Sequence, residues 1–211
     1  MQFINKIFYN TGGSTSRANN EGPSLTKQQI NDFFTFVHAN NVNQVAQLID
    51  ENMEYLHCRE DTEWKYTALH WAAQKGFDGM VATLIEQGVD VGVEASKYNW
   101  RAIHLACRFG HPKVVHLLLD AGEDINVVQN DDDRANAIHW AAQFGHEEVF
   151  NLLLERGADY NFKNAKGNSL IHIGACYGFN FVINKCIELG CPVDLKTDNK
   201  WEYTGLHWAA Q

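Results

Sequence analysis

From about residue 60 onward, apolar and polar positions recur in pairs of short helical segments. The first segment of each pair opens on a leucine or isoleucine, a histidine and then small apolar residues. The second carries a wider apolar stripe at helical spacing, as in VVHLLLDA at 114–121. Glycine suits the left-handed residue that closes a helix, so the glycines after each segment predict where the helices end. These glycines are Gly76, Gly110, Gly145 and Gly178 after the first segments, and Gly88, Gly122, Gly157 and Gly190 after the second.

The opening word of the first segment recurs at a nearly fixed interval. It reads TALHWAA (67–73), RAIHLAC (101–107), NAIHWAA (136–142), SLIHIGA (169–175) and TGLHWAA (204–210). Its histidines are His70, His104, His139, His172 and His207, separated by 34, 35, 33 and 35 residues. Such a period is typical of stacked supersecondary units, each of which buries its apolar face against its neighbours. The pattern therefore favours a quasi-linear repeat protein that binds rather than catalyses.

Residues 25–59 have the shape of a repeat without its histidine word. Apolar residues between Ile30 and Val37 fall at i, i+3, i+4 and i+7, which predicts one helix with Thr26 or Ser24 as its N-cap. A second short amphipathic helix is expected after Asn41. A terminal unit whose outer face meets water has no need of the internal signature. We therefore interpret residues 25–59 as an N-terminal capping repeat.

The remaining divisions follow from composition and from the period. Residues 10–24 are rich in Gly, Ser and Asn and bury little area, so 1–24 is expected to be a flexible leader. MQFINKIFYN at 1–10 lacks the apolar stretch and cleavage site of a signal peptide. The predicted repeats are 60–95, 96–130, 131–163, 164–197 and a partial repeat at 198–211. Since the last unit stops inside its first helix, we expect the natural protein to continue past Gln211.

Charge and cysteine content narrow the partners and the compartment. A formal net charge of −9 argues against nucleic acid and against an anionic membrane surface, since both select a basic face. No stretch approaches the ~20 apolar residues of a membrane span, so direct membrane insertion is not expected. The five cysteines are scattered without a C-x-x-C pair, which favours reduced thiols inside the cell. A cytoplasmic protein is predicted; a nuclear location, or delivery into a host cell as an effector, also fits.

No cofactor, metal or catalytic residue is nominated by a motif. The word histidines lie in different layers, too far apart to share a zinc ion comfortably, and so favour a structural role. His146 opens no H-E-x-x-H motif, because residue 150 is a phenylalanine. The acids from Asp131 to Asp133 suggest either calcium or a solvated turn, and the second is favoured. Cys107 and Cys176 are interpreted as packing residues.

Taken together, these words resemble the ankyrin-repeat family. Its pattern is Gly-x-Thr-Pro-Leu-His-x-Ala-Ala-x-x-Gly-His, then Val-x-x-Leu-Leu-x-x-Gly-Ala-Asp, and 134–161 matches it closely. The resemblance extends over about 60–211 and implies an all-α solenoid of stacked helix-turn-helix units with short β-turn fingers. It also implies that the histidines hydrogen-bond within and between repeats. Arg101 and Asn136 replace the word-initial threonine, and only Gly167 keeps the preceding glycine. Atypical turns are therefore expected in the middle units.

The resemblance also indicates where a partner would bind. In the family, contacts tend to come from the turn before each word and from the end of the first helix. Tyr, Trp and Arg, which are enriched at binding hot spots, recur at these positions. The candidates are Trp64, Tyr66, Tyr98, Trp100, Arg134, Trp201 and Tyr203 in the turns, and Gln74, Lys75, Arg108, Phe109, Gln143, Phe144 and Tyr177 at the helix ends.

Some of these tryptophans have a second interpretation. Trp64, Trp100 and Trp201 could instead fold onto the neighbouring unit in place of the missing turn residues. Trp71, Trp140 and Trp208 directly follow the histidines and are interpreted as structural.

Two asparagines raise a further possibility. Asn126 and Asn161 end strings similar to those that an asparaginyl hydroxylase modifies in ankyrin proteins. The simpler interpretation is an asparagine that stabilises a turn.

The functional hypothesis is a protein-protein interaction module that binds another protein or a peptide through the concave face and turn fingers. The alternative is the targeting or regulatory arm of a larger enzyme, channel or secreted effector whose active part lies beyond residue 211. A structural spacer is a third option, and the oligomeric state is left open.

Overall fold

The computed structural model describes residues 24–95, 98–197 and 202–210. The expected leader at 1–24 lies outside these residues except for Ser24, and Trp201 lies outside them as well.

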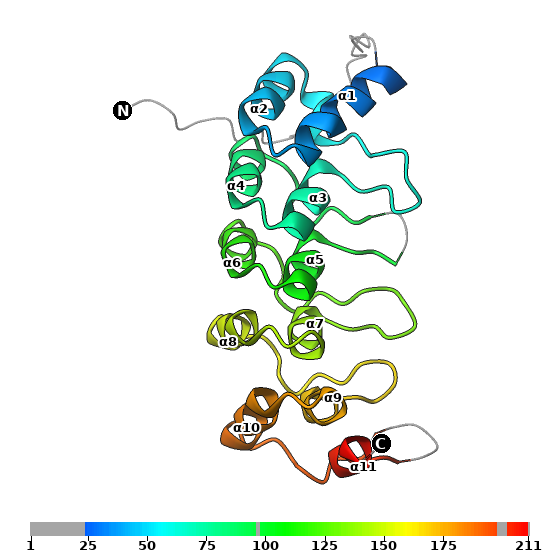
Figure 1. The fold of residues 1–211 in the computed structure, drawn as a ribbon, viewed down its shortest axis with the longest axis vertical. Coiled ribbons are helices and arrows are strands. Elements are labelled where there is room, and N and C mark those ends of the chain that lie inside the picture. The colour runs from blue at the N-terminus through cyan, green and yellow to red at the C-terminus, as the bar shows by residue number, and fades with distance from the viewer. Residues whose placement is uncertain (1–23, 96–97, 198–201, 211) are drawn as a thin grey trace, which may run out of the picture.

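The described chain folds into pairs of antiparallel helices that stack in chain order (Figure 1). The elements are α1 (Lys27–His38), α2 (Val42–Glu51), the 3-10 helix η1 (Met53–Leu56), α3 (Ala68–Lys75), α4 (Asp78–Glu86), α5 (Ala102–Phe109), α6 (Pro112–Asp120), α7 (Ala137–Gln143), α8 (Glu147–Glu155), α9 (Leu170–Tyr177), α10 (Asn180–Glu188) and α11 (Gly205–Ala209). Helices α1, α3, α5, α7, α9 and α11 form one column, and α2, α4, α6, α8 and α10 form the other. The prediction of an all-α repeat solenoid is confirmed.

Helix ends follow the local signals in the sequence. Thr26 caps α1 and forms a reciprocal pair of hydrogen bonds with Gln29, as a capping box does. Gly76 ends α3 in the left-handed conformation, with φ of 71°. The second helices begin earlier than their apolar stripes, because Pro112 and Glu147 suit a first helical turn. The 3-10 turn η1 was not expected from the sequence.

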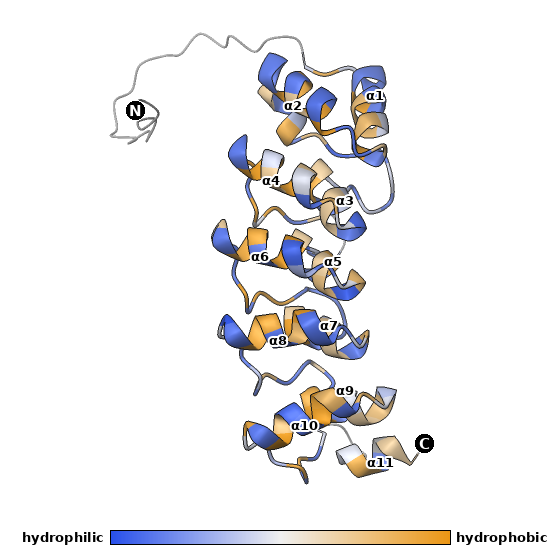
Figure 2. Ribbon diagram, turned by 60° about the vertical axis from the view of Figure 1, so that its left-hand side comes forward, coloured by the Kyte–Doolittle hydropathy of each residue, from blue (hydrophilic) through white to orange (hydrophobic). Residues whose placement is uncertain are grey.

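The two columns bury different kinds of side chain. Small residues of the first helices, such as Ala72 and Ala106, are fully buried and allow neighbouring layers to approach closely. Leucines of the second helices, such as Leu118 and Leu153, are also fully buried and fill the space behind them. Figure 2 shows hydrophilic stretches over α1 and α2 at one end of the stack and broad apolar bands on α6 and α8.

Each buried word histidine links two adjacent repeats. The Nδ1 atom of His70 accepts a hydrogen bond from the Thr67 backbone N–H at 3.3 Å and lies 2.8 Å from the Thr67 hydroxyl. On the other side of the ring, Nε2 donates to the Trp100 carbonyl of the next repeat at 2.9 Å. His104 makes the same link to the Val127 carbonyl at 3.0 Å. The structural role expected of these histidines is confirmed.

Equivalent links recur in the later repeats. His139 reaches the Asn168 carbonyl at 3.3 Å, and His172 reaches the Tyr203 carbonyl at 3.1 Å. In His172, as in His70, Nδ1 accepts from the backbone N–H of the word-initial residue, here Ser169 at 3.3 Å, so both ring nitrogens have partners.

The extended loops between repeats are fingers closed by backbone hydrogen bonds. Examples are Glu60 N–H to the Tyr66 carbonyl at 2.9 Å and Ala95 N–H to the Trp100 carbonyl at 2.8 Å. Neighbouring fingers also bond to each other, since Asn130 N–H donates to the Tyr98 carbonyl at 3.0 Å. The fingers are therefore held as one row.

The missing turn glycines are replaced without a change of backbone conformation. Gly167 has φ of 75°, and the equivalent residues Lys65, Asn99 and Arg134 also have positive φ, of 51°, 52° and 47°. The expectation of atypical middle turns is thus corrected for the third unit, where the left-handed residue is simply not a glycine. The second unit does differ, because Tyr98 has positive φ as well. A residue that has a side chain is strained in this left-handed backbone conformation, and the hydrogen bonds around the turn offset that strain.

Arg101, in place of a word-initial threonine, forms a buried ion pair. Its guanidinium lies 3.1 Å from Glu123, whose side chain is 1% exposed, and 3.1 Å from Glu94. Burial raises the pKa of Glu123, and this effect outweighs the lowering by Arg101. One oxygen of Glu123 has no hydrogen-bond partner among the described residues. The pair therefore brings little net stability, although each charge needs the other.

The ion pair is tested by a double-mutant cycle. Arg101→Thr leaves the Glu123 carboxylate buried and unpaired, so it should lower the free energy of unfolding by about 3 kcal/mol. The double variant Arg101→Thr/Glu123→Ala copies Thr67 and Ala158 of other repeats and should recover most of that loss. Urea unfolding of the four proteins provides the measurement. Additive losses in the double variant would contradict this account.

Burial of the histidines makes stability sensitive to acid. It lowers the pKa of His70, His104 and His139 to about 4, whereas an unfolded histidine titrates near ~6.5. Between these values the unfolded chain binds protons that the folded chain does not. Stability is therefore complete above about pH 6.5 and falls as the pH drops towards 4.

We expect the free energy of unfolding to fall by about 1.4 kcal/mol per pH unit for each of these histidines, approaching about 4 kcal/mol per unit for the three. Urea unfolding between pH 7.5 and 5 measures the slope. His104→Gln should reduce the slope by the share of one imidazole. A flat profile would show that these imidazoles are not held neutral.

Candidate functional site

The predicted helix-end residues lie in a row along the first-helix column. Phe109, Phe144 and Tyr177 occupy equivalent positions in successive repeats and are 43%, 40% and 49% exposed. Lys75 is the corresponding exposed residue one repeat earlier. The fingers lie beside this row and expose Trp64 and Tyr98 on adjacent fingers, with ring centroids 6.5 Å apart. We call the surface formed by these helix ends and fingers the inner face.

Two predicted turn residues do not face solvent. Tyr66 is 6% exposed and stacks on the His70 ring at 5.3 Å. Trp100 is 7% exposed and packs against Trp140 at 5.0 Å. The expectation that both point outward is corrected, and for Trp100 the alternative of packing onto a neighbouring repeat is confirmed. The sequence showed that these two side chains are large, but whether they point inward or outward depends on the neighbouring repeat.

The tryptophans that directly follow the histidines pack beneath the inner face and are fixed by hydrogen bonds. Trp140 is buried and donates from Nε1 to Gln129 Oε1 at 2.6 Å. Trp71 is half-buried and donates to Glu60 Oε2 at 2.9 Å. The structural interpretation of these two is confirmed, while the side chain of Trp208 lies outside the described part of the structure.

Arg108 stands at the centre of the aromatic residues. Its guanidinium carbon lies over four rings, at 5.5 Å from Trp100, 5.9 Å from Phe109, 5.1 Å from Trp140 and 4.8 Å from Phe144. These rings come from two successive repeats. A cation over an aromatic face is attracted by the ring quadrupole, so Arg108 fixes the relative positions of the repeats it touches.

Two hollows open on the inner face. One has a volume of about 220 Å³ and lies between the first two repeats. It is lined by Trp64, Tyr66, Trp71, Gln74, Trp100, Leu105, Arg108 and Phe109. The other has a volume of about 210 Å³ and lies beside Gln143 and Tyr177, whose Nε2 and hydroxyl atoms are 2.9 Å apart. The structure thus brings Trp64, Tyr66, Gln74, Trp100, Arg108 and Phe109 together, and Gln143 with Tyr177. Arg134 is on an exposed finger, and Tyr203 is half-buried near α11.

Histidines that the sequence did not assign to the site hold the helix ends in place. His111 donates from Nε2 to the Gln74 carbonyl of the preceding repeat at 3.0 Å, and His146 does the same to the Arg108 carbonyl at 2.9 Å. The Gly-His pair before α6 and again before α8 is the signal that could have revealed this role. Its meaning depends on contact between repeats, which periodicity alone does not show.

Gly110 is required both for its conformation and for this contact. Its φ is 76°, and a Cβ atom placed on it would lie 2.5 Å from Nδ1 of His146. Gly122 offers a matched comparison, because its φ is 93° and no atom lies within 4 Å of such a Cβ.

We expect Gly122→Ala to cost about 1–2 kcal/mol through backbone strain alone. Gly110→Ala should cost clearly more, since the ring must also move and its bond to Arg108 is lost. Chemical denaturation of the two variants measures the difference. Equal losses would mean that the His146 contact contributes nothing.

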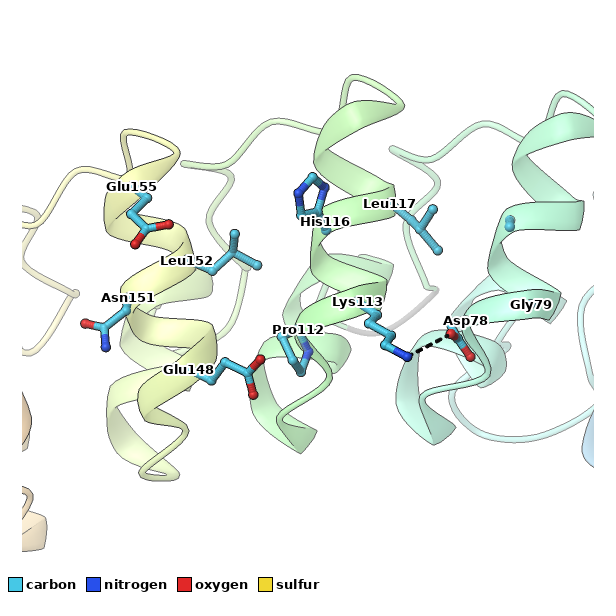
Figure 3. Close-up of a pocket in the computed structure, with 11 residues that line it drawn as sticks. Asp78, Gly79, Pro112, Lys113, His116, Leu117, Glu148, Asn151, Leu152 and Glu155 are labelled. Carbon is cyan, nitrogen blue, oxygen red and sulfur yellow. Dashed lines mark ion pairs between the residues drawn. The ribbon is translucent and has the colours of Figure 1, made fainter.

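The largest hollow described is on the opposite, outer surface. It has a volume of about 790 Å³ and runs over α4, α6 and α8, with Leu117 and Leu152 at its floor and Lys113 near Asp78 at its rim (Figure 3). None of the predicted contact residues lines it. Gly79 and Ala82 leave the space open because their side chains are small. Its lining includes no Phe, Tyr or Trp.

Other chemistry is sparse in the described residues. Within them no group of three or more His, Cys, Asp or Glu side chains could hold a metal ion. The described cysteines are all free thiols. Burial raises the pKa of Cys58 to about 12 and raises that of Cys107 further, so these thiols are poor nucleophiles. No described helix combines the length and apolar character of a membrane span.

The two asparagines of the hydroxylation hypothesis lie at equivalent exposed turns. Asn126 Oδ1 accepts from the Asp159 backbone N–H of the next repeat at 2.9 Å. Asn161 N–H donates to Asp159 Oδ1 at 2.9 Å. These bonds support the turn interpretation for Asn126, and hydroxylation stays a prediction.

Comparison with known proteins gives one family. The sequence profile described as ankyrin repeats (3 copies) matches residues 33–129, 97–164 and 138–211. A search of curated proteins found no match.

Proposed function

The chain belongs to the ankyrin-repeat family, and from that premise we propose that it binds a partner protein or an extended peptide through the inner face, which corresponds to the concave face and fingers of the family. Ankyrin repeats generally mediate protein-protein interaction. The single observation that carries the proposal is the row of exposed aromatic residues at equivalent helix ends, Phe109, Phe144 and Tyr177. Exposed rings in register on one surface are a costly arrangement unless a partner covers them.

The inner face is also rigid before any partner arrives. The helix ends that carry Gln74 and Arg108 are fixed by hydrogen bonds from His111 and His146. Neighbouring fingers are joined by backbone bonds, such as the one from Ala165 N–H to the Asp133 carbonyl at 2.8 Å. Preorganised residues lose little entropy on binding, so more of the contact energy appears as affinity.

The outer groove is the weaker candidate for the same role. It is larger, but its lining consists of aliphatic, polar and charged side chains with His116, and includes no Phe, Tyr or Trp. Aromatic and arginine side chains carry most of the energy at protein interfaces, and these lie on the inner face.

The same binding function would serve in a larger protein. As the targeting or regulatory arm of an enzyme, channel or secreted effector, the array would still recognise its partner through the inner face. The proposed compartment is intracellular and reducing, supported by the free thiols at Cys58, Cys107, Cys176, Cys186 and Cys191.

The test is substitution of the aromatic row. The triple variant Phe109→Ala/Phe144→Ala/Tyr177→Ala should reduce partner recovery at least about tenfold, because hot-spot rings contribute some 2 kcal/mol or more each. Recovery is measured by affinity purification from cell extract with quantitative mass spectrometry.

A matched control removes apolar side chains of similar exposure elsewhere. Met53, Ile187 and Val193 are 53%, 54% and 57% exposed and lie off the inner face. Their triple alanine variant should recover the same partners as the unmodified protein. If the aromatic variant, shown to be folded by circular dichroism, also recovers them unchanged, inner-face binding is wrong.

A further inference from the structure

The guanidinium of Arg108 has donors that the fold does not use. Among the described residues, Arg59 donates to the Lys65 carbonyl, Arg101 to two glutamates and Arg156 to Asp120. No acceptor in the described structure lies within hydrogen-bonding distance of the Arg108 side chain. A guanidinium donates in its own plane, so stacking its faces on rings leaves the N–H groups at its edge available.

The surroundings of Arg108 strengthen any ion pair formed there. Four rings lie within 6 Å of its guanidinium carbon and exclude part of the solvent on their sides. They also limit the space open to the side chain, so less rotamer entropy is lost when an acceptor binds than at a fully exposed arginine. An exposed arginine lacks both advantages and gives ion pairs of little net value.

The adjoining hollow has the size of a side chain. Its volume of about 220 Å³ is below the ~300–1,000 Å³ of pockets that bind small molecules. Rings of Trp64, Tyr66 and Trp71 form one wall, which suits an apolar group. Gln74 also lines the hollow, and its Oε1 is buried without a donor among the described residues.

Two cationic side chains, Arg108 and Lys75, lie over the rings on this part of the inner face, although the whole chain is acidic. Lys75 lies 6.0 Å above the Trp71 ring and has no acidic partner in the described structure. Glu60 lies against the same ring, but its two oxygens are occupied by His38 at 2.7 Å and Trp71 at 2.9 Å. A formal charge of −9 for the chain means that an acidic partner is repelled elsewhere and attracted here. Such a contrast favours one binding site and orientation.

We propose that Arg108 recognises a carboxylate side chain of the partner, and that an apolar side chain next to this acid fills the hollow beside Trp64, Tyr66 and Trp71. The partner segment is thus a peptide in which Asp or Glu adjoins an aliphatic or aromatic residue. Lys75, one repeat away, contacts a second acid of the same segment. Neighbouring layers are roughly 8–10 Å apart, which about three residues of extended chain would span. This inference rests on the proposed function and specifies its partner.

The experiment selects peptides from a random 12-residue phage-display library with the unmodified protein and with Arg108→Glu. The unmodified protein should enrich peptides that carry an acid beside an apolar residue. Arg108→Glu should lose these peptides and enrich ones with Lys or Arg in place of the acid. An unfolded variant would not acquire a defined opposite preference, so this exchange separates recognition from loss of structure.

Affinities of synthetic copies of the enriched peptides complete the test. Arg108→Met keeps the apolar stem and should bind about tenfold more weakly or worse, because a charge-assisted hydrogen bond is lost. Arg108→Lys should retain the acidic preference with reduced affinity, since it keeps the charge without the planar fork. Lys113→Glu, which changes the net charge as much as Arg108→Glu does but at an outer-face residue, should behave like the unmodified protein.

The outcomes separate this inference from the proposed function. Enriched peptides without an acidic preference, or with equal affinity for Arg108→Met, overturn the role of Arg108 and leave inner-face binding standing. Failure to enrich any peptide overturns it as well, while the partner purification described above still judges inner-face binding. If the enriched peptides bind equally well to the triple alanine variant of Phe109, Phe144 and Tyr177 and to the Arg108 variants, both the role of Arg108 and inner-face binding are overturned.

Discussion

The hydrogen bond from each word histidine to a carbonyl of the next repeat is the interaction on which the rest of the structure depends. A fully buried imidazole is tolerated only when both nitrogens have partners. In His70 one nitrogen is satisfied at the start of its own helix and the other reaches Trp100 in the following layer. Repetition of this link sets the spacing and register of successive layers. Burial between the layers lowers the pKa of these rings and keeps them neutral, which connects stability to pH.

Register between layers creates the inner face. Once the first helices are aligned, their C-terminal ends fall in a row, and His111 and His146 fix the carbonyls there. Phe109 and Phe144 at these ends remain 43% and 40% exposed, while the scaffold beneath them is rigid. Arg108 combines both roles, because its faces join two repeats and its edge remains free to bind.

Some residues adopt a conformation or an environment that is unfavourable for their type, because residues of other segments hold them there. Lys65 and Arg134 adopt positive φ although neither is a glycine. Arg101 brings a charge into the base of a finger, and Glu123 is buried to meet it. The sequence showed these departures but not their resolution, since each compensation comes from a residue in another segment. A pattern along the sequence does not show contacts between residues in different segments.

Periodicity alone determined the helix pairs, their glycine stops and the stacked architecture, because each depends on residues within one repeat or on strict recurrence. The hydrogen-bonding role of the histidines was implied by the family resemblance. The direction in which each turn side chain points was decided only by the tertiary structure. Tyr66 and Trp100 looked equivalent to Trp64 and Tyr98, yet the first two are buried and the others exposed. The hollow beside Arg108 likewise needs rings from two repeats. Whether a side chain at a turn meets solvent depends on what the adjacent layer places above it, and that is a property of packing rather than of sequence spacing.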